Sequence, residues 1–380
     1  MCLSRAAAVD NGAMHARLAV LGATGSIGRQ AIEVAAAHPD RLRITGLSCR
    51  TSAAACEALA GGDGARVVVA ERDGEDAVID LARADDVDVV VIGIPGIAAL
   101  RPTLAALDAG KAVAIAAKEV LVVAGHLVRA RVPRGAGERL RPIDSEHCAL
   151  WQCLRGEDRA AVTSVTLTAS GGPFRDTPLG ELRIVDADHA LRHPTWHMGP
   201  KVTIDSATLV NKAYEIIEAH WLFDLPYASI DAVIHPQSLV HALVRFADGS
   251  VKAQLADPDM RLPIQYALLY PARVSSPARE LRLHELTFAA IEPARYPCFG
   301  LVLEAARLGP AATIAVNAAD EIAVARFLAG ELSFTGIADV LERALAIAQR
   351  AALPAEPDLE TIVAFDHDVR RELSTQPAVA

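Results

Sequence analysis

The segment 142–147, PIDSEH, places two carboxylates, a hydroxyl and an imidazole side by side, directly after an apolar run typical of a strand. On an extended chain residues i and i+2 point to the same side, so Asp144 and Glu146 can present two oxygens to one point. Oxygen ligands favour Mg²⁺ or Mn²⁺ over zinc. Alternatively, Asp144 or Ser145 only caps the helix predicted from the residues that follow. Taken alone, the segment leaves both interpretations open.

Two further segments carry groups that bind phosphate. The sequence SGGPF at 170–174 offers backbone N–H groups and the Ser170 hydroxyl in a predicted loop, which suits an anion. Ser206, Asn211 and Lys212 follow within a stretch of helical pattern. A hydroxyl, an amide and an ammonium group together make a plausible phosphate site.

Glu215 lies one helical turn beyond Lys212. It is a candidate third metal ligand, supplied by a different element from Asp144 and Glu146. Without that context, an exposed helix carboxylate is the simpler interpretation of Glu215.

The segment 191–201, LRHPTWHMGPK, combines proline, glycine, two histidines, tryptophan and methionine. This mixture fits neither a buried helix nor a buried strand, and aromatic loops of this kind often close over a substrate. The segment therefore predicts a lid. His193 and His197 are alternatively ordinary surface histidines.

The sequence GATGSIG at 22–28 follows a strand-like run and opens a helical pattern. Glycines in such a turn let backbone N–H groups approach a pyrophosphate at the helix N-terminus. The spacing G-x-x-G-x-x-G is a variant of the dinucleotide fingerprint. In its strand–turn–helix context it favours a dinucleotide over a purely structural turn.

The end of the second predicted strand indicates which dinucleotide is bound. NAD sites usually place Asp or Glu about 20 residues after the glycines, to hold the ribose hydroxyls. Here the segment 47–52 reads LSCRTS and contains no acid. The cation of Arg50 and the hydroxyls of Thr51 and Ser52 suit a 2′-phosphate, so we expect NADP.

The elements that must position these groups follow from the hydrophobic pattern. Between residues 16 and 144, five short apolar runs alternate with stretches of helical spacing. This alternation predicts parallel strands joined by right-handed crossovers, hence a Rossmann-like doubly wound sheet. The region 145–270 mixes strands and helices, and Asp248-Gly249 between two β-rich runs predicts a hairpin. Beyond about residue 300 the chain is Ala-rich and helical in period.

The fold class expected is therefore α/β, with a Rossmann-like N-terminal sheet, a central α+β catalytic domain and a small C-terminal helical domain. We expect an NADPH-binding domain at 14–143 and a catalytic domain at 144–270, with the lid at about 189–200. A proline-punctuated connector at 271–299 then leads to the helical domain at 300–380.

Composition excludes several other classes of protein. The 380-residue chain is 52% hydrophobic and 22% charged, with a formal charge of −10. Such a charge argues against a nucleic-acid partner. The six cysteines are irregularly spaced, which indicates structural thiols in a reduced cytoplasm. No apolar run reaches the roughly 18 residues of a spanning helix, and we expect a soluble cytoplasmic protein. Met1 and Met14 both remain open as the start.

A longer set of motifs resembles one enzyme family, the 1-deoxy-D-xylulose 5-phosphate reductoisomerases. The motifs are GATGSIG, AAKE, DSEH, SGGPFRDTP, RHPTWHMGPKVTIDSATLVNKAYEIIEAHWLF, IHPQSLVHALVRFADGSVKAQLADPDMR, FAAIEPARYPC and NAADEIAVARFL. They occur in family order from about residue 17 to 340. So long an ordered set is far more specific than a glycine motif alone.

The resemblance implies roles for individual positions. Metal ligands would be Asp144, Glu146 and Glu215, and catalytic residues Lys118, Glu146 and His193. Substrate contacts would be Lys118, Ser145, Glu146, Ser170, His193, Trp196, Ser206, Asn211, Lys212 and Glu215. Cofactor contacts, including those of the 50–52 segment, would be Thr24, Gly25, Ser26, Ile27, Arg50, Thr51, Ser52, Glu119 and Gly199. Trp196 and Met198 would lie on the mobile lid.

The resemblance also implies the reaction. An NADPH-dependent enzyme with Mg²⁺, Mn²⁺ or Co²⁺ would rearrange 1-deoxy-D-xylulose 5-phosphate, by retro-aldol cleavage and re-aldolisation, to an aldehyde. NADPH would then reduce the aldehyde to 2-C-methyl-D-erythritol 4-phosphate, an isoprenoid precursor of the non-mevalonate pathway. The family's habit suggests a homodimer, and the expected partner is a small sugar phosphate.

Three short segments depart from the family pattern. The family usually has NKES where this chain has Ala117 and Val120 around Lys-Glu. The 2′-phosphate segment commonly reads Gly-Lys/Arg-Asn rather than residues 49–52 of this chain, and Pro95 replaces a residue that is usually valine. All three changes lie in the predicted cofactor domain. We therefore expect them to affect NADPH affinity or preference more than the chemistry.

Two other functions compete with this interpretation. A semialdehyde dehydrogenase also begins with a Gly-Ala-Thr-Gly loop, but it needs an activated cysteine nucleophile. Cys148 follows DSEH, and nothing nearby in the sequence marks it as activated. A non-catalytic NADP-binding paralogue is the second alternative, motivated by Ala117 and Pro95. Against it, all three candidate metal ligands are present.

Overall fold

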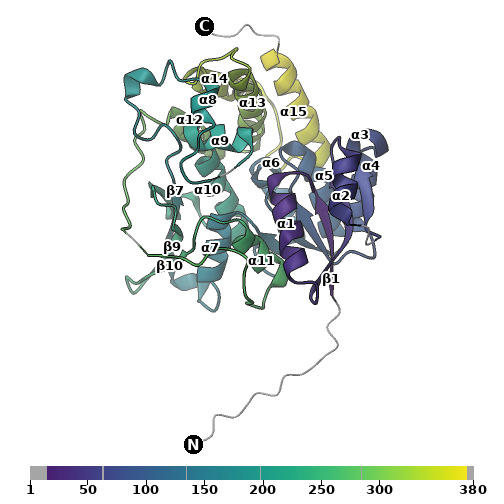
Figure 1. Ribbon diagram of the computed structural model, residues 1–380. Coiled ribbons are helices and arrows are strands. Elements are labelled where there is room, and N and C mark those ends of the chain that lie inside the picture. Colours follow the sequence, from purple (N-terminus) through teal and green to yellow (C-terminus); the bar gives the residue numbers. More distant parts are fainter. Residues whose placement is uncertain (1–14, 62–63, 134, 197, 284, 375–380) are drawn as a thin grey trace, which may run out of the picture.

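A six-stranded parallel sheet forms the first half of the computed structural model, which describes residues 15–61, 64–133, 135–196, 198–283 and 285–374 (Figure 1). The strand order is β3-β2-β1-β4-β5-β6. The strands are β1 (Ala16–Leu21), β2 (Leu42–Cys49), β3 (Arg66–Val69), β4 (Val89–Ile92), β5 (Ala112–Ile115) and β6 (Leu140–Pro142). The predicted doubly wound sheet is confirmed. Met14 and His197, named above, lie outside the described residues.

Helices cover both faces of this sheet, as its apolar strands require. They are α1 (Ser26–Ala37), α2 (Ala53–Ala60), α3 (Ala70–Asp73), α4 (Glu75–Arg83), α5 (Leu100–Asp108) and α6 (Lys118–Arg131). The chain runs outward to β3 on one side of β1 and to β6 on the other. A crevice therefore opens at the carboxyl ends of β1 and β4, where open α/β sheets bind ligands.

The glycine loop lies at this crevice, between β1 and α1. A Cβ added at Gly28 would lie 2.3 Å from the Gly22 carbonyl oxygen and 2.6 Å from the Ala23 Cα. Only glycine lets α1 approach the strand end so closely. The strand–turn–helix context that the sequence predicted is confirmed.

A second sheet follows, with strand order β10-β9-β7-β8. Its strands are β7 (Val162–Ala169), β8 (Ile230–Ile234), β9 (Val240–Phe246) and β10 (Val251–Leu255). Strands β9 and β10 are antiparallel around Asp248-Gly249, so the predicted hairpin is confirmed. Strand β8, which the sequence analysis did not identify, pairs in parallel with β7.

The helices of this second part are α7 (Ser145–Cys153), α8 (Ala187–Ala190), α9 (Pro200–Thr208), α10 (Val210–Phe223) and α11 (Arg261–Leu269). Helix α10 is buried on almost every side and packs against α6, α9 and α12. A helix buried all round must be fixed by its neighbours. It therefore holds its polar side chains in constant positions.

Four C-terminal helices complete the fold: α12 (Pro297–Leu308), α13 (Pro310–Leu328), α14 (Gly336–Arg350) and α15 (Leu359–Ser374). Helix α13 lies inside this group, in contact with α12, α14, α15 and also α6. Helix α15 returns to the first sheet domain, near α5 (Figure 1). There Arg101 forms two hydrogen bonds with Glu360, at 2.8 and 2.7 Å.

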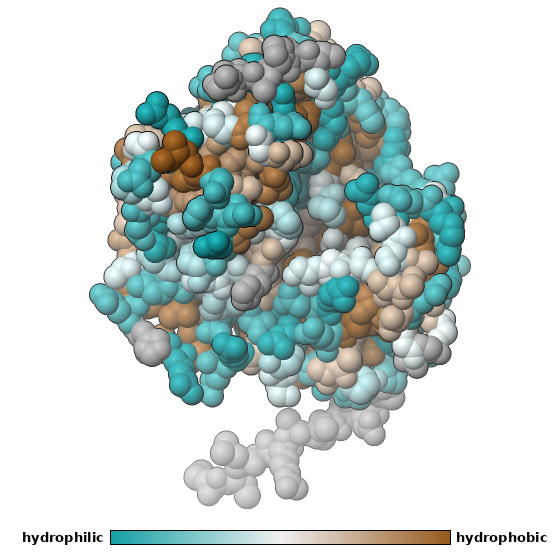
Figure 2. Space-filling model, turned by 45° about the horizontal axis from the view of Figure 1, so that its top comes forward, coloured by the Kyte–Doolittle hydropathy of each residue, from teal (hydrophilic) through white to brown (hydrophobic). Residues whose placement is uncertain are grey.

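The surface carries mostly polar side chains on the face drawn in Figure 2. Over the whole described surface, the larger exposed apolar side chains include Ile184, Leu283 and Leu308. Over the described ranges, no helix is both long and apolar enough to cross a membrane.

Candidate active site

A cavity of about 350 Å³ opens between the glycine loop, the starts of α6 and α7, the end of β7 and helices α9 and α10. It gathers most of the predicted site residues. Those that line it are Gly25, Ser26, Ile27, Lys118, Glu119, Asp144, Ser145, Glu146, Ser170, Trp196, Gly199, Ser206, Asn211, Lys212 and Glu215, with Met198 of the lid. Thr24, Arg50, Thr51, Ser52 and His193 are not in its lining.

Three carboxylates converge in this cavity. One oxygen from each of Asp144, Glu146 and Glu215 lies within 4.8 Å of the others. The local geometry differs from the extended pair that the sequence suggested. Asp144 occupies the N-cap position of α7 and Glu146 its first turn, so the helix start, rather than a strand, aims both side chains. The Asp144 side chain makes no capping hydrogen bond, and the Ser145 hydroxyl donates to Glu146 Oε2, so neither side chain caps α7 as the simple alternative required.

Two buried lysines neutralise these carboxylates. The Lys118 Nζ atom lies 2.9 Å from Asp144 Oδ2 and donates to Asn211 Oδ1 at 2.6 Å. The Lys212 ammonium lies 3.1 Å from Glu146 Oε1 and also pairs with Glu215. The three carboxylates therefore already attract positive charge in the free protein. The sequence grouped Asn211 and Lys212 with Ser206 as a phosphate site. In the structure the Asn211 and Lys212 side chains contact the carboxylate cluster instead of the serines.

The carboxylates do not ionise alike. Burial and the neighbouring Glu146 raise the pKa of Glu215 to about 7, although both lysines oppose this. For Asp144 and Glu146 burial acts in the same direction. There, however, the ammonium groups of Lys118 and Lys212 win, and the pKa of each carboxyl lies below its ordinary value. Glu215 is therefore the member of the cluster whose charge changes near neutral pH.

Metal binding should consequently depend on pH. A metal ion needs ionised ligands, and in the free protein a proton competes for Glu215 below about pH 7. We expect the affinity for Mn²⁺ to fall by up to about tenfold per pH unit below that value, and to level off above it. Calorimetric titration with Mn²⁺ at several pH values measures this slope. An affinity independent of pH across the neutral range would contradict the prediction.

A histidine and a fourth carboxylate lie behind the cluster, and the sequence analysis assigned neither. The His147 Nδ1 atom is 3.2 Å from Glu218 Oε2 and 3.5 Å from Asp144 Oδ2. Its Nε2 atom lies 2.8 Å from the Glu215 carbonyl oxygen. Burial would lower the pKa of His147, but Glu218 and Asp144 raise it to about 9. This imidazole therefore carries charge and steadies Asp144.

Glu218 also belongs to a second possible ligand group, Asp144–His147–Glu218. Both His147 and Glu218 are fully buried and neither lines the cavity. A metal ion that must also contact substrate is therefore better placed at Asp144, Glu146 and Glu215. The signal for Glu218 was present in the sequence, because it lies three residues after Glu215 and so on the same helix face.

Ser170, His193 and Ser206 form a separate group. The His193 Nε2 atom lies 3.0 Å from Ser170 Oγ and 3.1 Å from Ser206 Oγ. Its Nδ1 atom accepts from the backbone N–H groups of Thr195 and Trp196, at 3.2 and 2.9 Å. The proton of the neutral imidazole is therefore on Nε2. Donation from Nε2 leaves the two serine hydroxyl protons to an anion in the cavity.

The glycine at 172 keeps this group together. Its φ is +69°, and a Cβ added there would lie 2.7 Å from both Ala207 Cα and the Ser206 carbonyl oxygen. Gly172→Ala must therefore push α9 away from Ser170. We expect the KM for a phosphate-bearing substrate to rise about tenfold or more. Gly180→Ala is the matched control, because nothing lies within 4 Å of its added Cβ. Equal KM values for the two variants would contradict this role.

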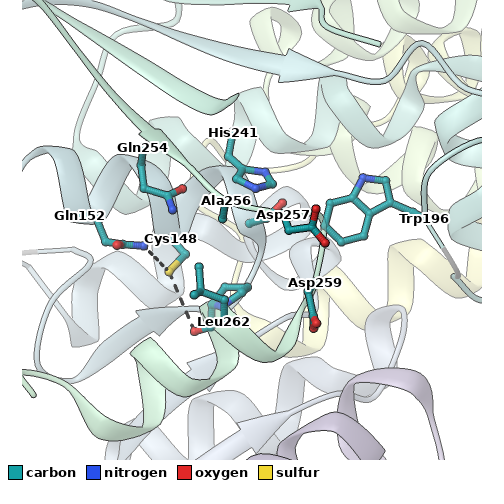
Figure 3. A pocket seen from close by; sticks show the side chains of 11 residues that line it. Cys148, Gln152, Trp196, His241, Gln254, Ala256, Asp257, Asp259 and Leu262 are labelled. Carbon is teal, nitrogen blue, oxygen red and sulfur yellow. Dashed lines mark hydrogen bonds between the residues drawn. The ribbon is translucent and has the colours of Figure 1, made fainter. Parts of the chain in front are cut away.

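The lid tryptophan separates the main cavity from a small adjoining one. Trp196 lies beside His241, with 6.2 Å between ring centroids. The small cavity, about 10 Å³, is drawn in Figure 3, with Asp257 and Asp259 near the tryptophan and Cys148 on the opposite side. It has room for about one water molecule.

Cys148 is not an activated nucleophile. Burial raises the pKa of its thiol to about 12. Its sulfur accepts from Gln152 Nε2 at 3.3 Å and faces the Pro263 carbonyl (Figure 3). A thiol held protonated in this way cannot serve a semialdehyde dehydrogenase. That alternative is wrong.

The predicted 2′-phosphate segment lies outside the cavity, at the carboxyl end of β2. Arg50 is largely exposed and pairs with Glu71 at 3.1 Å. Ser52 caps α2 by accepting from the Ala55 N–H. Because β2 and β1 are neighbours in the sheet, this segment and the glycine loop lie at the same edge. A long dinucleotide can reach from one to the other.

Comparison with known proteins gives three matching family models. The 1-deoxy-D-xylulose 5-phosphate reductoisomerase model matches residues 18–73 and 63–125. The C-terminal domain model of the same enzyme matches residues 140–223, and a DXP reductoisomerase C-terminal domain model matches residues 255–372. Together they cover most of the chain.

Individual relatives of this chain are members of the same enzyme family. The 1-deoxy-D-xylulose 5-phosphate reductoisomerase of Geobacillus kaustophilus (strain HTA426) is 46% identical over 375 residues, covering 93% of this chain and 97% of the relative. That of Thermomicrobium roseum is 46% identical over 380 residues, covering 95% and 98%.

Solved structures that resemble this chain also belong to that enzyme family. A DOX-P reductoisomerase crystallised with NADPH, fosmidomycin and magnesium has a TM-score of 0.85 and 37% identity, covering 94% of this chain and 97% of that one. The Zymomonas mobilis enzyme with NADPH has a TM-score of 0.83 and 35% identity, covering 95% and 98%. The chain therefore belongs to the 1-deoxy-D-xylulose 5-phosphate reductoisomerase family of NADP-dependent oxidoreductases, as its motifs predicted.

Proposed function

We propose that this chain converts 1-deoxy-D-xylulose 5-phosphate to 2-C-methyl-D-erythritol 4-phosphate in its main cavity, with NADPH as reductant and a divalent metal ion. One observation carries the proposal. A single cavity joins a dinucleotide-type glycine loop, three converging carboxylates and a pair of serines suited to phosphate. Each of these groups serves one part of the reaction.

The donor set fits a divalent ion. Asp144, Glu146 and Glu215 offer only oxygens, the ligands of Mg²⁺ and Mn²⁺. In the free protein the ammonium groups of Lys118 and Lys212 provide the positive charge that these carboxylates attract. When bound, the ion supplies Lewis acidity toward the oxygen atoms of the substrate.

The glycine loop fits NADPH for a similar reason. The close approach at Gly28 places the backbone N–H groups of Ser26 and Ile27 at the N-terminus of α1, where pyrophosphate is favoured. Glu119 and Gly199 line the far side of the same space. Arg50, Thr51 and Ser52 at the adjacent strand end would take the 2′-phosphate.

The remaining side chains orient the substrate and hold charge. Lys118 stays protonated, because Asp144 and Glu215 raise the pKa of its ammonium group against the effect of burial. It therefore supplies constant positive charge beside the oxygen that becomes negative as the carbon–carbon bond breaks. Ser145 donates to Glu146 Oε2 at 2.7 Å and holds that carboxylate in place.

The lid and the serine group complete the site. Ser170 and Ser206 donate to the phosphate, with His193 fixing their orientation. Trp196 and Met198 cover the reacting atoms and keep water from the fragments. NADPH bound at the glycine loop would supply the hydride that reduces the aldehyde carbon, and a proton would go to the aldehyde oxygen.

The test is loss of NADPH absorbance with purified protein, 1-deoxy-D-xylulose 5-phosphate and Mg²⁺ or Mn²⁺. We expect turnover that stops with EDTA and is much slower with NADH. A folded, NADPH-binding protein without turnover would instead favour the non-catalytic paralogue, with Ala117 and Pro95 as the first positions to restore.

The proposal keeps the other expectations drawn from the sequence. These are a homodimer, a cytoplasmic location and a division into 14–143, 144–270, 271–299 and 300–380. The lid at 189–200 belongs to the second of these regions.

A further inference from the structure

Helix α9 carries part of the substrate side of the cavity. Val202, Asp205 and Ser206 of this helix line the cavity, and Gly199 at its N-cap ends the lid. The helix has only nine residues and no side-chain capping hydrogen bond. A helix this short is marginal by itself, so packing against other elements must fix its position.

A buried ion pair links α9 to the C-terminal helices. The Lys201 Nζ atom, in the first turn of α9, lies 2.6 Å from Asp205 Oδ2 on the same helix and 2.5 Å from Asp320 Oδ2 on α13. Asp320 is fully buried and Asp205 nearly so. Over the described ranges, this is the one ion pair between α9 and helices α12–α15.

Helix α13 also contacts the cofactor side. Glu321, the residue after Asp320, lies against the loop that follows β4, where a Cβ added at Gly96 would meet its Oε1 atom at 2.8 Å. Gly93 and Pro95 of the same loop line the cavity. Adjacent residues of one helix therefore face the substrate-side helix and the cofactor-side loop.

We propose that Lys201 and Asp320 are positioning residues: their ion pair anchors α9, and with it Ser206, to α13. Because Glu321 of α13 lies against the cofactor-side loop, this ion pair fixes the distance between Ser206 and that loop. The C-terminal helical domain then sets the geometry of a cavity whose phosphate-binding and metal-binding side chains lie elsewhere in the sequence. This role rests on the proposed function, since the position of Ser206 matters through the substrate phosphate.

The test variant is Asp320→Leu, which removes the link while keeping the branched shape and the number of heavy atoms of the side chain. Lys201 keeps Asp205 as its partner, so the variant leaves no unpaired charge on the lysine. Asp366→Leu is the matched control. Asp366 is equally buried, on α15, and its partner Arg370 likewise keeps a second carboxylate, Glu321, at 2.9 Å. The hydrogen bonds of the Asp366 carboxylate run to Arg370 on its own helix, away from the link between α9 and α13.

We expect Asp320→Leu to raise the substrate KM about tenfold or more, because small misplacements of a binding group are costly. The effect on kcat should be smaller. Hydrogen exchange of the amides of residues 201–208 should accelerate, a readout that needs no activity. Asp320→Asn, which keeps a hydrogen-bond acceptor, should stay within about twofold of the wild-type KM. Asp366→Leu should change neither readout.

Wild-type turnover is measured first, so that failure of the proposed function is recognised separately. An unchanged KM together with unchanged exchange of residues 201–208 in Asp320→Leu would overturn the positioning role. An equal effect of Asp366→Leu would overturn it too, by showing a general loss of stability. If Asp320→Leu does not fold, Lys201→Gln is measured in the same way, and the same outcomes decide.

Discussion

Glu215→Gln is expected to abolish metal-dependent turnover, lowering kcat by about 10³-fold or more. Glu215 is almost completely buried, and α10 supplies it to the ligand group that lines the cavity. The amide keeps the shape of the side chain but removes the negative charge that a divalent ion needs. Titration with Mn²⁺ should show weakened binding in parallel with the lost activity.

Glu218→Gln provides the matched control for this variant. Glu218 lies one turn further along the same helix, is equally buried and does not line the cavity. Because it acts only through His147, we expect a loss of about 10- to 100-fold. If Glu215→Gln kept its metal dependence, Glu215 could not be the third ligand.

Lys118→Met should lower kcat by about 10²-fold, through loss of a fixed positive charge beside the developing oxyanion. Its signature should differ from that of Glu215→Gln. Removing an ammonium group 2.9 Å from Asp144 takes away a cation that competes with the metal. At alkaline pH, where Glu215 is ionised, Mn²⁺ should therefore bind at least as tightly as in the wild type.

Lys252→Met is the control for a lysine outside the site, since Lys252 pairs with Glu157 at the surface. It should leave both kcat and metal affinity unchanged. Parallel losses of activity and Mn²⁺ affinity in Lys118→Met would show that this lysine organises the carboxylates instead of acting on the substrate.

Much of the fold followed from local patterns. The glycine loop, the alternating strands and helices of the first sheet and the hairpin at Asp248-Gly249 each depend on residues close in sequence. Strand β8 was missed, because its short run lies in a region of mixed pattern and its pairing with β7 spans more than 60 residues. Long-range pairing of this kind leaves little local signal.

In the site, too, residue types predicted some features, while others depend on long-range packing. The types of the ligand residues indicated a metal site, yet the reason offered was wrong, since Asp144 and Glu146 begin a helix rather than lying on an extended chain. The contacts of Lys118 with Asp144 and Asn211 depend on how α6, α7 and α10 pack together. Residue types alone do not encode such packing.

The return of α15 to the first sheet domain has a consequence for dissection of the molecule. Helix α15 pairs with α5 through Arg101 and Glu360, and α10, α13 and α15 pack against α6. The first sheet domain and the later helices therefore form one cooperative unit. A fragment that stops at residue 143 would expose the apolar surface of α6 that α10, α13 and α15 cover. We expect such an excised fragment to aggregate, and unfolding of the whole chain to proceed as one transition rather than domain by domain.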